Sequence, residues 1–300
     1  MRSRPFLLVL TLVIISGCQR DVQTPEEATA APYVPVLTQQ WMLDSGLDRP
    51  ESVIFDAARD VLYITNLVGE GDGMDGIGYI AKVSTAGEMV DQDWITGLNA
   101  PKGIALAGDR LYASDINSLV EIDLDAGAIA NKYTIEGDAY LNDVTVHPDG
   151  AVYVTDSRYS KIYKLENGEF SLWLESDQIQ MPNGIHVIGD ELVAAAGDSS
   201  AENPGQARYF QAISLNDKSI RSIESAAPDG ALDAVEPDGK GGIFTTDWLS
   251  GRLMYFKEGE GTTLLQQLGQ GSADVDYIAT SNMLYVPVMQ EGQLIAYKVD

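Results

Sequence analysis

The sequence predicts an all-β fold, a six-bladed β-propeller closed by an N-terminal strand that completes the last blade. One pattern recurs six times in the 300 residues: a short apolar segment, a turn rich in Gly and Asp, and a second strand. At intervals of 40–51 residues, these second strands are anchored on Tyr63, Tyr112, Tyr153, Val193, Phe244 and Tyr285. Repeats of this length, with strand-like alternation and no convincing helical stretch, are typical of four-stranded propeller blades.

The outer strands of the blades follow each second strand as amphipathic segments. Third strands are expected at 118–124, 160–166, 252–258 and 293–299. Fourth strands are expected at 87–95, 170–176 and 262–269. Each copy therefore supplies the four strands of one blade.

The sixth copy ends at Asp300 before a fourth strand can form. Residues 36–46, VLTQQWMLDSG, resemble the fourth strand TTLLQQLGQG elsewhere in the chain. We therefore expect the N-terminal segment to close blade six and to remove the exposed edge of a half-finished sheet. One closed domain over residues 36–300, rather than two domains, then accounts for the length of the chain.

The N-terminus has the features of an export signal. Arg2 and Arg4 precede a run of about ten mostly apolar residues, 6–15, which is too short to span a hydrocarbon core of ~30 Å. Small residues then lead to Cys18, the single cysteine, in a pattern that resembles the bacterial lipoprotein signal. The prediction is a signal peptide over 1–17, lipidation of Cys18 and a disordered tether over 18–35; an ordinary secretory signal is the alternative.

This signal places the protein in the bacterial cell envelope. Gln19, rather than Asp, follows the cysteine, which favours a lipid anchor on the periplasmic face of the outer membrane. No other run approaches ~20 apolar residues, so the propeller itself is expected to be soluble and monomeric.

Composition limits the chemistry. The net charge of −26, from 19 basic and 45 acidic residues, excludes nucleic acid as a partner. One cysteine excludes a disulfide scaffold, and two histidines leave little for zinc or histidine catalysis. His147 and His186 are expected to be packing or turn residues. Chemistry in this chain is therefore expected to depend on oxygen ligands.

Two long insertions follow second strands, at 67–79 and 197–210. Because strands in a blade alternate in direction, these loops open on the same face as the loops that lead into the first strands. We expect both insertions to rim that face, where long loops are often functional.

The residues that open the first strands are expected to face one end of the central channel. These residues are Glu51, Lys102, Asn142, Asn183, Asp233 and, approximately, Asp274. Four of them carry short oxygen-donor side chains, and two carboxylates with two amides suit a hard divalent cation such as Ca²⁺. Mg²⁺, Mn²⁺ and Zn²⁺ remain open. The alternative is that Asn and Asp only form turns before strands.

Over about residues 33–300 the sequence resembles the senescence-marker protein/regucalcin, gluconolactonase and paraoxonase-like propellers. The resemblance rests on the blade pattern and on Pro50-Glu51, Leu141-Asn142-Asp143, Pro182-Asn183-Gly184 and Asp233. It implies one divalent metal held by Glu51, Asn183 and Asp233, with Asn142 beside it. It also implies hydrolysis of a lactone or related ester, in which Asp233 takes a proton from the attacking water.

Three positions depart from the family pattern. Asp229, in Pro228-Asp229-Gly230, is a second candidate for the blade-five ligand; Asp233 is favoured because it precedes its anchor by the same spacing as Asn142. Tyr140 stands where sugar-lactone members carry Arg, which argues against a sugar-acid substrate. Lys102 either holds a substrate carboxylate or points to solvent, and Lys102 and Tyr140 are the predicted substrate contacts.

A non-catalytic propeller that binds a protein, glycan or small ligand at the envelope is the alternative function, because propellers share one scaffold among many functions. No Gly-x-Ser-x-Gly motif is present. The GxGxxG match at 71–76 lacks a βαβ context, so it does not predict a dinucleotide site.

Overall fold

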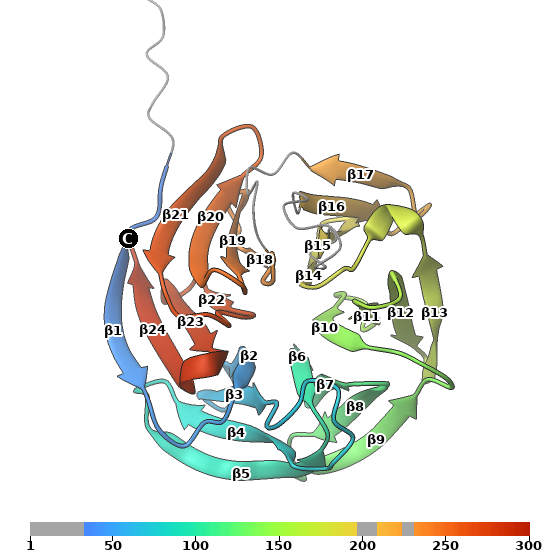
Figure 1. Ribbon diagram of the computed structural model, residues 1–300, viewed down its shortest axis with the longest axis horizontal. Helices are drawn as coiled ribbons and strands as arrows, with labels where there is room; N and C mark the ends of the chain where they lie inside the picture. Colours follow the sequence, from blue (N-terminus) through green and yellow to red (C-terminus); the bar gives the residue numbers. More distant parts are fainter. Residues whose placement is uncertain (1–32, 197–208, 224–230) are drawn as a thin grey trace, which may run out of the picture. The chain divides into compact units, whose positions relative to one another are not determined.

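Six four-stranded antiparallel sheets surround a central channel, as the computed structural model of the chain shows (Figure 1). The structure describes residues 33–196, 209–223 and 231–300. Each sheet is one blade, with its first strand beside the channel and its fourth strand outermost. The predicted six-bladed propeller is confirmed.

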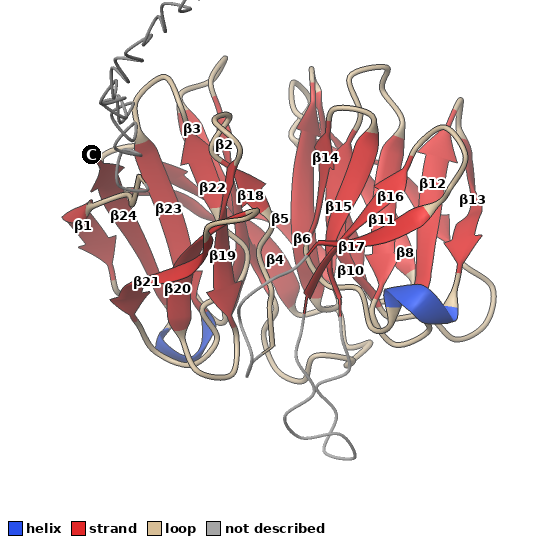
Figure 2. Cartoon of the chain, turned by 90° about the horizontal axis from the view of Figure 1, so that it is seen from above, coloured by secondary structure: helices blue, strands red, loops and turns tan. Residues whose placement is uncertain are grey.

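The strand bounds follow the predicted repeats. Blades one to three are β2 (Pro50–Asp56), β3 (Val61–Asn66), β4 (Gly78–Ser84) and β5 (Met89–Leu98); β6 (Pro101–Ala107), β7 (Arg110–Asp115), β8 (Ser118–Asp123) and β9 (Ala128–Thr134); and β10 (Leu141–Val146), β11 (Val152–Asp156), β12 (Lys161–Glu166) and β13 (Glu169–Glu175). Blades four to six are β14 (Ile185–Ile188), β15 (Glu191–Ala196), β16 (Tyr209–Ser214) and β17 (Ile220–Ile223); β18 (Glu236–Pro237), β19 (Gly242–Asp247), β20 (Arg252–Lys257) and β21 (Gly261–Gln267); and β22 (Asp276–Ile278), β23 (Met283–Val288), β24 (Gln293–Val299) and β1 (Leu37–Leu43). Two short 3-10 helices, η1 (Asp177–Ile179) and η2 (Met289–Glu291), lie at the lower face of the ring in Figure 2.

The N-terminal strand closes the ring, as predicted. β1 pairs antiparallel with β24 and forms the outer strand of blade six. The backbones of Val36 and Asp300 exchange two hydrogen bonds of 3.2 and 3.0 Å. Trp41 on β1 donates its indole N–H to the carbonyl of Thr85 in blade one, at 2.9 Å. β1 therefore completes the sheet of blade six and also links this blade to blade one.

The core lies between neighbouring blades. The anchor residues of the repeat are buried there, with Tyr63 and Phe244 at 0% and 1% exposure. The Tyr63 ring stacks on Trp94 of the outer strand at 4.6 Å, and Phe244 packs on Tyr277 of the next blade at 5.0 Å. Outer strands such as β9 are largely exposed. The recurring anchor thus packs against the outer strand of its own blade or against the next blade.

Some expectations fall outside the described residues. Cys18, the signal peptide and most of the tether lie there, as do residues 197–208 of the second insertion. The first insertion is observed between β3 and β4, as predicted. Among the described residues, no helix is long and apolar enough to cross a membrane.

The closure generates a stability prediction. Trp41→Ala removes a partly buried aromatic ring and its hydrogen bond to blade one, and should cost about 2–4 kcal/mol of unfolding free energy in urea denaturation. Met42→Ala is the matched control, because Met42 is a β1 side chain with 44% exposure and should change stability by less than about 0.5 kcal/mol. Equal effects of the two substitutions would show that β1 does not close the ring through Trp41.

Candidate functional site at the channel mouth

Four of the six second strands end in a repeated pair, a hydroxyl residue followed by Asp or Asn, with both side chains fully buried. The pairs are Thr65-Asn66, Ser114-Asp115, Thr155-Asp156 and Thr246-Asp247. They lie where the first strand of each blade begins, at the mouth of the channel.

The hydroxyl of each pair connects two blades. Thr155 Oγ1 accepts the N–H of Asp143 in its own blade and donates to the carbonyl of Asn183 in the next blade, both at 2.9 Å. Thr65 Oγ1 likewise donates to the carbonyl of Lys102 at 2.7 Å, and Ser114 donates to that of Asn142. The hydroxyls therefore fix the backbone of the residues that open the first strands.

The Asp or Asn of each pair holds the loop that leads into the first strand. Asp115 accepts the N–H groups of Asn99 and Ala100, both at 2.9 Å. Asp247 accepts the N–H of Ala231 at 3.0 Å. These loop N–H groups have no hydrogen-bond partner in a strand, and the Asp or Asn side chain accepts their hydrogen bonds instead. The backbone at the channel mouth is therefore held in place.

Two glycines permit the close approach of neighbouring blades at the mouth. A Cβ on Gly184 would lie 1.9 Å from the carbonyl oxygen of Asp233, and one on Gly103 would lie 2.4 Å from Cα of Asp143. Any side chain at these positions would push the next first strand away. The glycine of the Pro-Asn-Gly segment therefore sets the distance between Asn183 and Asp233.

The five predicted first-strand residues lie together. Glu51, Lys102, Asn142, Asn183 and Asp233 line one cavity of about 260 Å³ at the channel mouth. Tyr140 lines the same cavity, as does Gly71 of the first insertion, so this insertion rims the site as predicted. Asp229 lies outside the described residues.

The expectation for blade six is wrong by one residue. Ser272 pairs with Val288 as Pro50 pairs with Asn66, so Ala273 is the counterpart of Glu51. Asp274 comes one residue later and lines a different cavity, deeper in the channel. The same pairing of Leu232 with Asp247 places Asp233 at the position of Glu51 in blade five.

Three of the predicted metal ligands have an oxygen that is buried without a hydrogen-bond donor. Among the described residues, Oε2 of Glu51, Oδ1 of Asn142 and Oδ1 of Asn183 accept no hydrogen bond. Such oxygens are costly in a folded protein unless a ligand meets them. Two carboxylates with amide oxygens match the ligand preference of a hard divalent cation, so these residues fit the expected metal.

The orientation of Asn142 follows from its neighbour. Ser157 Oγ donates its single proton to the carbonyl of Pro182 at 2.6 Å, so it must accept the 2.9 Å hydrogen bond from Asn142 Nδ2. This assigns the amide nitrogen to Ser157 and leaves Oδ1 as the atom available to a ligand.

The charges of the site are concentrated. Burial raises the pKa of Glu51 well above its usual range, and repulsion by Asp233 and Asp274 raises it further, while Lys102 opposes the shift. Two acidic groups held together in a buried place create a negative potential. A bound cation would favour the ionised form of Glu51.

Lys102 does not point to solvent. Its side chain is buried, its Nζ donates to the carbonyl of Ala100 at 3.1 Å, and it lies 4.4 Å from the ring centroid of Tyr140. Burial lowers the pKa of Lys102 to about 8, although Glu51 opposes the shift. This ammonium therefore lies on the wall of the cavity at an energetic cost.

Sequence reasoning missed two cations at the mouth. Arg158 lies 4.5 Å from the centroid of the Tyr140 ring and pairs with Asp72 of the first insertion at 3.4 Å. Arg49 lines the cavity. The sequence pattern predicted neither residue. Arg49 directly precedes Pro50, and Arg158 follows the end of a second strand.

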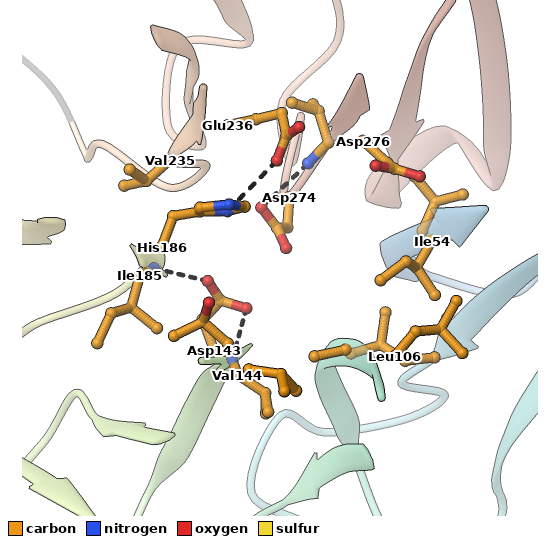
Figure 3. A pocket seen from close by; sticks show the side chains of 16 residues that line it. Ile54, Leu106, Asp143, Val144, Ile185, His186, Val235, Glu236, Asp274 and Asp276 are labelled. Atoms are coloured by element: carbon orange, nitrogen blue, oxygen red, sulfur yellow. Dashed lines mark hydrogen bonds and ion pairs between the residues drawn. The ribbon is translucent and has the colours of Figure 1, made fainter. Parts of the chain in front are cut away.

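A second cavity, of about 180 Å³, lies deeper in the channel (Figure 3). Its carboxylates bridge blades: Asp143 accepts the N–H of Ile185 and Asp276 that of Phe55, both at 2.7 Å. Glu236 accepts the N–H of Tyr277 at 3.3 Å. Among the described residues, no three His, Cys, Asp or Glu side chains are arranged to hold a metal ion. These acids serve the free edges of the first strands.

The two histidines differ. His147 lies in a turn as predicted, with Nδ1 2.8 Å from Asp149 Oδ1. His186 instead lines the deeper cavity, and its Nδ1 is 3.5 Å from Glu236 Oε2 (Figure 3). His186 lies within strand β14, so it has no turn role, and its side chain packs beside Glu236 at the wall of this cavity.

The fold and the site define a six-bladed propeller with oxygen donors at the mouth of its channel. The profile of the SMP-30/gluconolactonase/LRE-like region matches residues 49–267. The chain belongs to this family. No curated protein matches the sequence significantly.

Solved structures share the fold at low sequence identity. A gluconolactonase from Xanthomonas campestris has a TM-score of 0.65 at 14% identity, over 89% of this chain and 94% of that one. Virginiamycin B lyase from Staphylococcus aureus has a TM-score of 0.62 at 13% identity, over 88% and 99%. A luciferin-regenerating enzyme has a TM-score of 0.61 at 14% identity, over 89% and 95%.

The inter-blade hydroxyls generate a second prediction. Thr155→Val keeps the shape of the side chain but leaves the N–H of Asp143 and the carbonyl of Asn183 without this partner, and should cost roughly 1–3 kcal/mol of unfolding free energy. Thr245→Val is the matched control, because Thr245 is 1% exposed and its hydroxyl has no partner among the described residues. The control should be neutral or stabilising; an equal loss in both would contradict the account.

The deeper cavity generates a pH prediction. Burial raises the pKa of Asp276 to about 7; the Phe55 N–H opposes the shift and Asp274 adds repulsion. The folded protein therefore holds this proton more tightly than the unfolded chain, whose Asp pKa is about 3.9. The stabilisation is present below pH ~4 and is lost as pH rises through about 7.

Asp276→Asn should accordingly raise the melting temperature by a few degrees at pH 8 and leave it nearly unchanged near pH 4, since Asn still accepts from Phe55. The measurement is thermal unfolding followed by circular dichroism across this pH range. A variant that melts lower than the parent at pH 8 would contradict the assignment.

Proposed function

We propose that the cavity at the channel mouth binds one divalent cation, Ca²⁺, through Glu51, Asn142, Asn183 and Asp233, and that the protein hydrolyses a lactone or related ester there. The observation that carries the proposal is the set of three buried oxygens without hydrogen-bond donors, on three different blades beside Asp233. Membership of the gluconolactonase-like family supports the reaction class.

When bound, the cation would polarise the carbonyl of the ester and stabilise negative charge that develops on its oxygen. Glu51, Asn142 and Asn183 would hold the cation, and their backbones are fixed by neighbouring blades. Asp233 is buried, and its N–H donates to the carbonyl of Thr246 at 3.0 Å. A preorganised site of this kind loses little entropy on binding substrate.

Asp233 acts as the general base. As the water oxygen bonds to the carbonyl carbon, its proton passes to the Asp233 carboxylate, and the proton then goes to the alkoxide that leaves when the ester bond breaks. Lys102 and Tyr140 form the wall against which the substrate lies. The apolar side chains of Leu67, Trp248 and Met289 exclude water from the other side.

The same proposal includes the place of the protein in the cell. The lipoprotein-like signal and Cys18 would anchor the chain to the envelope, and the tether would carry the propeller on the periplasmic face. The small-molecule lactone or ester would reach the mouth from that compartment.

The test is turnover of a panel of lactones and aryl esters with Ca²⁺ and with EDTA. At least one member should be hydrolysed only with Ca²⁺, and Asp233→Asn should reduce kcat by roughly 10²–10⁴-fold. Asp276→Asn is the matched control: it changes an acid of the deeper cavity that does not line the mouth, and it should keep most of the activity. A folded protein that binds Ca²⁺ and turns over no member of the panel would contradict the proposed hydrolysis.

A further inference from the structure

The ammonium of Lys102 forms no ion pair in the part of the chain that the structure describes, although Glu51 attracts it from a greater distance. Its side chain is 3% exposed, its one hydrogen bond there goes to the carbonyl of Ala100, and no carboxylate oxygen lies within 4.0 Å of Nζ. Buried charged side chains are nearly always paired, because an unpaired one costs several kcal/mol in lost hydration. An ammonium has three donors, so Lys102 retains donors for a ligand.

Lys102 lies where its remaining N–H donors can meet a ligand in the cavity at the channel mouth. It lines the same cavity as Glu51 and Asp233 and lies beside the ring of Tyr140. Arg158 lies over this ring as well, at the outer edge, where Asp72 partly neutralises it. Tyr140 thus carries a buried cation and an exposed cation, and the buried one forms no direct ion pair.

The charge balance of the site indicates an anion. Glu51 and Asp233 supply two negative charges, which one divalent cation would neutralise. Lys102 then leaves one positive charge in the cavity, and Arg49 adds another at its wall. A single carboxylate fits one buried ammonium, whereas a doubly charged phosphate would meet stronger repulsion from a chain of net charge −26.

The remaining wall of the cavity is apolar. Leu67, Trp248, Leu249 and Met289 lie there. Leu249 is 48% exposed although it is a large apolar residue at the rim. A ligand that fits both walls has a charged end and an apolar body.

We propose that the substrate carries a carboxylate, separate from the ester or lactone group that is cleaved, and that Lys102 beside Tyr140 binds this carboxylate. That the bound molecule is a substrate rests on the proposed function. That the cavity has an anion subsite rests on the geometry of Lys102 alone. Lys102 is therefore a specificity-determining residue, and the substrate class is an apolar lactone or ester with a free carboxylate.

Calorimetric titration with two non-hydrolysable probes of equal shape, cyclohexanecarboxylate and cyclohexanecarboxamide, tests the subsite in saturating Ca²⁺. The parent protein should bind the carboxylate roughly 10- to 100-fold more tightly than the amide. Lys102→Met should abolish that preference and leave amide binding unchanged. Lys82→Met is the matched control, because Lys82 lies 4.1 Å from the Trp94 ring centroid on blade one and does not line the cavity.

The comparison of the two probes on the parent protein needs no variant. Thermal unfolding shows whether each variant is folded. In saturating Ca²⁺, Lys102→Met should melt no lower than the parent, because the cation then neutralises Glu51 and the substitution removes a buried ammonium that forms no ion pair. Equal binding of both probes, or a carboxylate preference that persists in Lys102→Met, would overturn the inference even if the protein hydrolyses neutral lactones. A preference lost only in Lys102→Met, in a protein without hydrolytic activity, would support the anion subsite and contradict the proposed function.

Discussion

The free edge of each first strand is the constraint on which the rest of the structure depends. In a propeller blade the first strand pairs with the second strand on one side and faces the channel on the other. Its backbone groups on the channel side, and those of the loop that enters it, still need partners. The buried Thr-Asp type pairs at the ends of the second strands supply them at the channel mouth.

The same requirement separates structural oxygens from ligand-binding oxygens. In the deeper cavity the carboxylates of Asp143, Asp276 and Glu236 accept backbone N–H groups from the next blade. At the mouth the hydroxyls of the second strands already serve the backbone. The side-chain oxygens of Glu51, Asn142 and Asn183 are left without donors. The acidic residues deeper in the channel stabilise the ring, while those at the mouth remain available for a cation.

The sequence predicted the blades because their signal is local and periodic. Buried anchors recur once per blade, aromatic in five blades and Val193 in blade four, and they pack where two blades meet. The closing strand was predictable for the same reason, because residues 36–46 resemble another outer strand. The residues that open the first strands followed from counting back from each anchor.

The rest depended on geometry that spacing does not encode. The connection between the first two strands is one residue longer in blade six than in blades three and five, because Asp276 pairs with Tyr285 whereas Glu236 pairs with Phe244. Counting back from Tyr285 by the spacing of those blades therefore gave Asp274, although Ala273 reaches the mouth. Arg158 lies over Tyr140 because the N–H of Ser157 donates to the carbonyl of Tyr140, and Asp72 of the first insertion then pairs with Arg158. The orientation of Asn142 is fixed by Ser157, which no pattern singled out. Side chains that meet across blades are visible only once the ring is closed.

The central claim is that the oxygens left without donors hold a divalent cation. Equilibrium dialysis against Ca²⁺, with the bound metal quantified by atomic spectroscopy, tests it most directly in the parent protein and in Asn183→Leu. The parent should hold one equivalent of Ca²⁺, and Asn183→Leu should bind it at least tenfold more weakly while it remains folded. A folded parent protein that binds no divalent cation, or a variant that binds as tightly as the parent, would contradict the account.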